Sequence, residues 1–230
     1  MEELEPLFSR SPAPRREAEA RPDDWATREL NHRLVNSLQL AVDFLGLQQQ
    51  RAADPGARQA LEDAMARLAA VGQLHRYLSV QDPHALVELS AFLRGLCGVV
   101  GLSTGLACEL SAQPISVPAH MAQHVGLLIN ECAINARKHA YGHDGGVLRI
   151  ACAISPGRLT LTVADEGPGL RSAQGPGRQG LGMDLIGAIV RQLHGAFTAE
   201  TRGGAQFTFT IPLASAVPFG GRSFAGWNEV

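Results

Sequence analysis

Four polar side chains share one face of a predicted helix and could act on a phosphorylated ligand. The helix is expected from about Pro118 to Tyr141, with an apolar face along Val125, Ile129, Cys132 and Ala136. The polar face carries Glu131, Asn135, Lys138 and His139. Carboxylate and carboxamide oxygens can hold Mg²⁺ or its waters, and an ammonium group can balance phosphate charge. Taken alone, the same stripe also fits a solvated helix face.

A glycine-rich stretch follows a predicted strand and leads into another predicted helix. Asp165-Glu166-Gly167-Pro168-Gly169 ends the strand, and Gly175 and Gly177 punctuate the next residues. Gly180-Leu181-Gly182-Met183 then opens the helix. Glycines let backbone N–H groups approach an anion closely, and a helix start adds free donors. The stretch is predicted to be a lid over a triphosphate.

His32 lies in a third chemically suggestive segment, Glu29 to Gln39. The helical period predicts one apolar stripe, which consists of Leu30, Leu34, Leu38, Ala41 and Leu45. His32 falls on the opposite side with Asn36, Gln39 and Asp43. An imidazole displayed in this way is available for chemistry, although a solvated surface histidine is the simpler interpretation on single-residue grounds.

Composition narrows the class of protein. The chain has 230 residues with 45% hydrophobic content, enough for one large domain or two modest ones, of which two is the better expectation. Its net charge of -2 gives no basic field for nucleic acid or anionic lipid. The four cysteines lack metal-ligand spacing and are expected to be buried thiols in a reducing compartment. No segment reads as a signal peptide or a membrane span, so a cytoplasmic, soluble protein is expected.

Periodicity predicts the elements that must position these groups. Two amphipathic helices are expected on either side of a break at 53–56. The first covers about 23–51, with Asp23 or Asp24 as its N-cap, and the second ends near Leu78. Together they would form an antiparallel hairpin. Helices are expected at about 89–100, 118–141 with Pro118 at its first position, and 183–193. Strands are expected at about 107–110, 147–154, 159–164, 196–201 and 206–211.

The predicted organisation is α+β with four regions. They are a flexible arm over 1–22, a dimerisation and histidine-bearing hairpin over 23–82, an α/β region over 83–213 and a tail over 214–230. A two-helix hairpin cannot cover its own apolar stripes, which Val35 and Val42 widen. A homodimer that completes a four-helix bundle through residues 23–80 is therefore expected.

Five motifs in order resemble the sensor histidine kinases with a type 2 HisKA domain, related to the HWE kinases. The resemblance covers roughly residues 25–212 and rests on segments that look like a phosphoacceptor box, an N box and three glycine motifs. These segments are 29–39, 130–140, 165–170, 180–183 and 203–207; residues 67–77 also resemble the second hairpin helix.

The resemblance implies a GHKL (Bergerat) ATP-binding α/β sandwich, with a mixed sheet under three helices, beside the hairpin. It implies Asn135 as a Mg²⁺ ligand, Glu131 near the metal and the attacking group, and Lys138 as a phosphate contact. It places Asp165 on the adenine amino group and His139 against the base. The implied lid residues are Gly167, Gly169, Gly180, Leu181 and Gly182.

The implied activity is attack of neutral His32 on the γ-phosphoryl group of Mg-ATP, followed by transfer to an aspartate of a response-regulator receiver domain. Arg33 follows the histidine directly, which excludes an acid there, so either Glu29 or Glu131 could orient the imidazole. Asn36 could position water for dephosphorylation of the partner. A separate input protein or the N-terminal arm could supply the signal.

Other functions stay open from sequence alone. A histidine phosphotransferase would keep the hairpin but lose the N-box and glycine residues, whereas Asn135, Asp165 and Gly169 are present. A GHKL-type ATPase clamp, or a serine kinase that acts on an anti-sigma partner, would not need a histidine-bearing hairpin. A nucleic-acid or scaffold role would leave the lid glycines unexplained.

Overall fold

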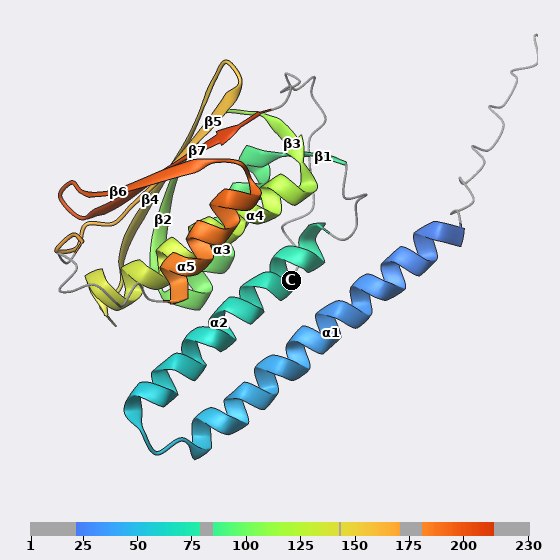
Figure 1. Ribbon diagram of the computed structural model, residues 1–230, viewed down its shortest axis with the longest axis vertical. Coiled ribbons are helices and arrows are strands. Elements are labelled where there is room, and N and C mark those ends of the chain that lie inside the picture. Colours follow the sequence, from blue (N-terminus) through green and yellow to red (C-terminus); the bar gives the residue numbers. More distant parts are fainter. Residues whose placement is uncertain (1–21, 79–84, 143, 171–180, 214–230) are drawn as a thin grey trace, which may run out of the picture.

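The computed structural model describes residues 22–78, 85–142, 144–170 and 181–213 (Figure 1). Residues 22–32, 77–78 and 181 are described by their backbone alone. The arm was expected over 1–22, and its residues 1–21 lie outside the described residues, whereas Pro22 belongs to a helix. Gly175, Gly177, Gly180 and the tail over 214–230 also lie outside the described residues.

The N-terminal part is the expected antiparallel hairpin. Helix α1 (Pro22–Arg51) and helix α2 (Pro55–Leu78) run side by side (Figure 1). The Asp54 carboxylate accepts a hydrogen bond from the Ala57 backbone N–H at 2.7 Å, so Asp54 caps the start of α2. Helix α1 begins at Pro22, which means that the expected N-cap at Asp23 or Asp24 is wrong. Proline is tolerated at a first helical position because its missing N–H would have no partner there.

The face that α1 turns toward α2 is rotated from the predicted one. Val35, Leu38, Val42 and Leu45 are half-buried, whereas Leu34 of the predicted stripe is 44% exposed. Val35 and Val42 therefore lie within the packed face rather than at its side. The remaining exposed apolar side chains of α1 lie on another face and include Leu40, Phe44 and Leu47.

A five-stranded mixed sheet forms the second part, in the order β2-β4-β5-β7-β6. Its strands are β2 (Leu106–Ala112), β4 (Gly146–Ser155), β5 (Arg158–Ala164), β6 (Ala196–Thr201) and β7 (Ala205–Pro212). Only β2 and β4 pair in parallel among these strands, and the other neighbours are antiparallel. Each expected strand is present, one to two residues longer than predicted at several ends.

Three helices cover one face of this sheet (Figure 1). They are α3 (Leu89–Thr104), α4 (Ala119–Ala136) and α5 (Leu181–Gln192). Alternate strand residues such as Leu148, Leu161 and Phe209 point into the core that they share with α4, where Val125 and Ile129 are fully buried. The core therefore holds α4 against the sheet, and the polar face of α4 is left for other contacts.

A short antiparallel ribbon ties the starts of α3 and α4 together, which the sequence did not predict. Strand β1 (Leu86–Glu88) pairs with β3 (Ser116–Pro118). Pro118 is thus a strand end and the N-cap of α4, not its first helical residue as expected. At the other end, residues 137–141 continue α4 as a π-helix, η1 (Arg137–Tyr141), rather than as α-helix.

Gly98→Ala is expected to stabilise the protein by about 0.5–1 kcal/mol, since alanine loses less backbone entropy in a helix than glycine does. Gly98 lies within α3, and a β-carbon there would meet no atom within 4 Å. A rise in melting temperature of about 1–4 °C would follow. Gly105→Ala is the matched control, because Gly105 caps the same helix at φ 74° in equally open space. That variant should melt earlier, and a rise in both variants would contradict the explanation.

Candidate functional site

The polar face of α4 lies at its C-terminal end and runs into η1. Glu131 is 2% exposed, and Asn135 is half-buried one turn later. Lys138 and His139 belong to η1, where the helix widens by one residue per turn. Single π-turns of this kind are frequent at functional sites. The structure thus places the four predicted side chains along one continuous edge of the helical layer.

Asp165 lies at the end of β5 and is fixed by the backbone. Its Oδ1 atom accepts hydrogen bonds from the N–H groups of Gly167 and Ala205, both at 2.9 Å. Its own N–H donates to the Ala205 carbonyl at 3.0 Å. No other described residue bonds Oδ2, so this oxygen is left to accept a hydrogen bond from a ligand.

Three glycines allow the loop over 165–170 and the turn between β6 and β7 to close around Asp165. A β-carbon on Gly167 would overlap Ala140 of η1, and one on Gly204 would overlap the Asp165 carbonyl. Gly204 also has φ 158°, which side chains rarely adopt. Gly169 lies similarly close to Thr201, and the Tyr141 hydroxyl accepts from the Glu166 N–H at 2.7 Å. The loop is therefore held by η1 on one side and by the β6–β7 turn on the other.

The start of α5 approaches the polar face of α4. A β-carbon on Gly182 would lie 3.0 Å from Glu131 Oε2 and 3.4 Å from Asn135 Oδ1. Two oxygen donors of α4 thus converge beside the first turn of α5. Leu181 begins α5, described by its backbone alone, and Gly180 lies outside the described residues.

Helix α2 contributes two charged side chains to the same place. Arg67 Nε lies 3.0 and 2.9 Å from the two carboxylate oxygens of Glu131. Asp63, one turn earlier, forms an ion pair with Lys138. All four side chains are at least partly buried, with exposed fractions from 2% to 24%. The hairpin and the α/β part therefore meet at the candidate site.

Burial raises the pKa of the Glu131 carboxyl above its ordinary value, and the hydrogen bond and charge of Arg67 partly oppose this rise. Loss of Arg67 would leave a buried carboxylate without its cation and favour protonation of Glu131. Arg67 therefore helps to keep the site negative.

Comparisons with known proteins identify the family of the chain. Residues 29–103 match the histidine kinase family model HisKA_2, and residues 102–210 match the histidine kinase-like ATPase domain. The chain belongs to the histidine kinase family. The second match assigns ATP binding to the α/β part.

Two kinases resemble the chain over most of its length. Blue-light-activated histidine kinase 2 of Erythrobacter litoralis is 26% identical over 79% of this chain and 54% of its own. Sensor histidine kinase PdtaS of Mycolicibacterium smegmatis is 25% identical over 83% of this chain and 40% of its own. The chain therefore spans about half the length, or less, of these relatives.

A solved structure has the same fold. The histidine kinase domain of the E. litoralis EL346 kinase matches 83% of this chain and 92% of its own, with a TM-score of 0.56 and 24% identity. The predicted α+β class, with a helical hairpin and a GHKL-type α/β sandwich, is thereby confirmed.

The donor set of this histidine kinase fits Mg²⁺ held mainly by its nucleotide. Glu131 and Asn135 supply two hard oxygens beside the same residue of α5, Gly182, and oxygen is the ligand atom that magnesium prefers. Within the described ranges, no group of three or more His, Cys, Asp and Glu side chains could hold a metal ion. Phosphate oxygens and waters would have to complete the coordination.

The predicted phosphoacceptor lies away from this site. His32 and Glu29 fall in α1, and their side chains lie outside the described part; Asn36 is exposed. The contact between Leu38 and Gly72 shows the register of the two hairpin helices, because Leu38 lies 3.9 Å from a β-carbon built on Gly72. In this register the backbone of His32 is level with Leu78, about 11 residues and about 17 Å along the axis from Arg67.

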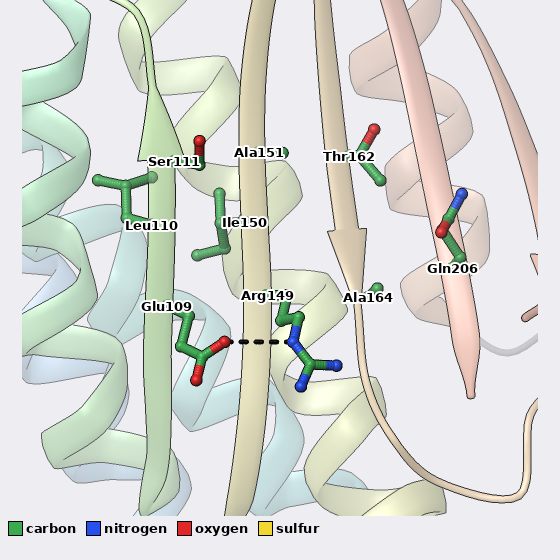
Figure 2. A pocket seen from close by; sticks show the side chains of 9 residues that line it. All are labelled: Glu109, Leu110, Ser111, Arg149, Ile150, Ala151, Thr162, Ala164 and Gln206. Atoms are coloured by element: carbon green, nitrogen blue, oxygen red, sulfur yellow. Dashed lines mark hydrogen bonds and ion pairs between the residues drawn. The ribbon is translucent and has the colours of Figure 1, made fainter. Parts of the chain in front are cut away.

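A separate depression of about 380 Å³ lies on the exposed face of the sheet (Figure 2). Its charged lining residues, Glu109 and Arg149, are joined at 3.2 Å, and Arg149 also pairs with Glu166. The depression contains none of the predicted site residues.

In the described stretches of the chain, every helix is too short or too polar to cross a lipid bilayer.

Sequence reasoning did not identify Asp63 and Arg67 as site residues. Their spacing of four is typical of an ordinary pair on one exposed helix face, and such pairs are common. The only earlier signal was the resemblance of residues 67–77 to the second hairpin helix of the family. Their role depends on how α2 packs against α4, which no local pattern encodes.

Proposed function

We propose that this chain is an ATP-dependent protein histidine kinase that phosphorylates His32 and passes the phosphoryl group to an aspartate of a response-regulator receiver domain. The observation that carries the proposal is the convergence of the Glu131 and Asn135 oxygens beside the start of α5, in a chain whose hairpin bears His32. The matches to both kinase family models support it.

The nucleotide would bind between α4, the Asp165 loop and the start of α5. Asp165 Oδ2 accepts a hydrogen bond from the adenine amino group, and His139 lies against the base. Lys138 contacts the phosphates, and Asn135 and Glu131 would hold Mg²⁺, which would spread the charge of the transferring group. The closing residues are Gly167, Gly169, Gly180, Leu181 and Gly182.

Phosphoryl transfer needs little from the protein beyond alignment and electrostatics. A neutral imidazole nitrogen of His32 bonds to the γ-phosphorus as the bond to the β–γ bridging oxygen breaks, which leaves ADP. Either Glu29 or Glu131 orients the imidazole. Asn36, exposed one turn beyond His32, holds the water for dephosphorylation of the partner. Because ATP is the donor, we place the reaction in the cytoplasm, with a separate protein or the N-terminal arm as input.

We assign phosphotransfer and dimerisation to residues 23–82 and catalysis to residues 83–213, between the arm and the tail. Leu40, Phe44 and Leu47 of α1 are 69%, 60% and 54% exposed and share one helix face. This apolar stripe supports a homodimer in which four helices bury it. A phosphotransferase without kinase activity is disfavoured because Asn135, Asp165 and the close-fitting glycines are all in place.

Incubation of the purified chain with Mg²⁺ and γ-³²P-ATP tests the activity. We expect a protein label that is lost in acid and survives alkali, as a phosphoramidate does. Nucleotide binding without label would favour the phosphotransferase, and acid-stable label would contradict a histidine acceptor.

Asp165→Asn is expected to weaken ATP binding about tenfold to hundredfold, the range for a lost hydrogen bond to a charged group. The two backbone donors hold the amide oxygen in the place of Oδ1, so the amide NH₂ faces the adenine amino group, donor against donor. Isothermal titration calorimetry with Mg·AMP-PNP measures the change. Glu166→Gln is the control, since its exposed carboxylate pairs with Arg149. Equal affinities in all three proteins would remove Asp165 from the adenine site.

A further inference from the structure

The contact between α2 and α4 has an apolar end and a charged end. At the apolar end, a β-carbon on Gly126 would lie 2.8 Å from a Leu74 methyl group and 3.2 Å from the Phe92 ring. The charged end holds the Arg67–Glu131 and Asp63–Lys138 pairs. The charged end alone overlaps the candidate nucleotide site.

The two charges of α2 correspond in sign to the two charged parts of Mg-ATP. Arg67 brings a cation to Glu131, where the metal would bind, and its guanidinium lies 3.2 Å from the point that a Gly182 β-carbon would occupy. Asp63 brings a carboxylate to Lys138, where phosphate would bind. One ammonium group cannot hold Asp63 and a phosphate at full strength, and the carboxylate would also repel the phosphate.

We propose that Asp63 and Arg67 form a charged latch that closes the nucleotide site, so that binding of Mg-nucleotide and docking of this end of α2 on α4 exclude each other. This inference rests on the proposed nucleotide site of α4 and adds to it a control by the hairpin. A ligand that binds one of two arrangements shifts the population toward that arrangement, by as much as its affinities differ.

The position of His32 agrees with a latched, non-transferring arrangement. Its backbone is about 17 Å along the hairpin from the level of Arg67. In a dimer whose twofold axis follows the helices, the partner's copy of this histidine is at the same height. Transfer in either protomer therefore requires the α/β part to leave the contact seen here, and release of the latch by nucleotide would couple loading to that movement.

The test compares Mg·AMP-PNP affinity of the full chain in matched variants by calorimetry. Asp63→Asn removes the competing charge, and Asp63→Ala removes the hydrogen bond as well while favouring helix. Glu62→Gln and Glu62→Ala, at the exposed neighbouring position, are the controls. We expect both Asp63 variants to bind about fivefold to tenfold more tightly than wild type, within the usual range of coupling between sites, and the controls to be unchanged.

The outcomes separate the latch from the proposed function. Tighter binding in both Asp63 variants, or binding in them with none in wild type, supports the latch. Unchanged or weaker binding in these variants, with wild-type binding intact, overturns the latch and leaves the nucleotide site standing. Absence of binding in every protein, each with a cooperative melting transition, overturns the proposed site and the latch with it.

Discussion

Replacement of His32 by glutamine is expected to abolish acid-labile phosphorylation, with label reduced at least about hundredfold. Glutamine keeps the length and polarity of the side chain but offers no nucleophilic nitrogen at neutral pH. His32 belongs to α1, whereas the nucleotide residues belong to α4, η1 and the Asp165 loop. Affinity for Mg·AMP-PNP should therefore stay within about twofold of wild type, since no nucleotide contact is removed.

His120→Gln is the control for this variant, because His120 is an exposed histidine at the start of α4. It should keep full labelling. Label that persists in His32→Gln would place the acceptor elsewhere. Loss of both label and nucleotide binding in that variant would point to misfolding, which the melting curve would reveal.

Gly204→Ala is expected to reduce nucleotide affinity at least about hundredfold and to lower the free energy of unfolding by about 2–4 kcal/mol. The new methyl group would overlap the Asp165 carbonyl and lie 2.9 Å from Oδ1, in a backbone conformation that alanine rarely adopts. The turn must then move away, which breaks the hydrogen bonds between Asp165 and Ala205. Calorimetry and urea unfolding measure the two effects.

The neighbouring residue gives a close control. Gly203 also has a positive φ, 65°, but a β-carbon there would meet nothing within 4 Å. Gly203→Ala should cost about 1–2 kcal/mol of stability from backbone strain and leave nucleotide affinity nearly unchanged. Equal loss of affinity in both variants would show that turn strain, not contact with Asp165, controls the site.

The sequence predicted the elements whose signals are long and local. The amphipathic period of the helices and the alternation of the strands are repeated many times, so tertiary packing rarely overrides them. Strands β1 and β3 were missed because three residues cannot establish an alternation. The predicted face of α1 was right at Leu38, Ala41 and Leu45 but wrong at Leu34, because Leu34 and Val35 are adjacent apolar residues and only packing against α2 selects between them.

The site residues that lie close together on one helix or at one strand end could be predicted from the sequence. Asn135 and Glu131 lie one turn apart on α4, and Asp165 ends a strand, so local spacing was sufficient to find them. The contacts of Arg67 and Asp63 join residues 64 and 75 positions apart. Such contacts depend on the docking of the hairpin, and the widened turn of η1 likewise depends on tertiary surroundings.

The close approach of Leu74 to Gly126 gives α2 a fixed point about which the helix could tilt. This contact is the pivot, and Arg67 and Asp63 lie about 10 Å and about 17 Å from it along the helix. A tilt of about 20° would move the Arg67 turn by about 4 Å and the Asp63 turn by about 6 Å. In such a tilt the Asp63–Lys138 pair would separate further than the Arg67–Glu131 pair, so the phosphate side of the site would open more widely than its metal side.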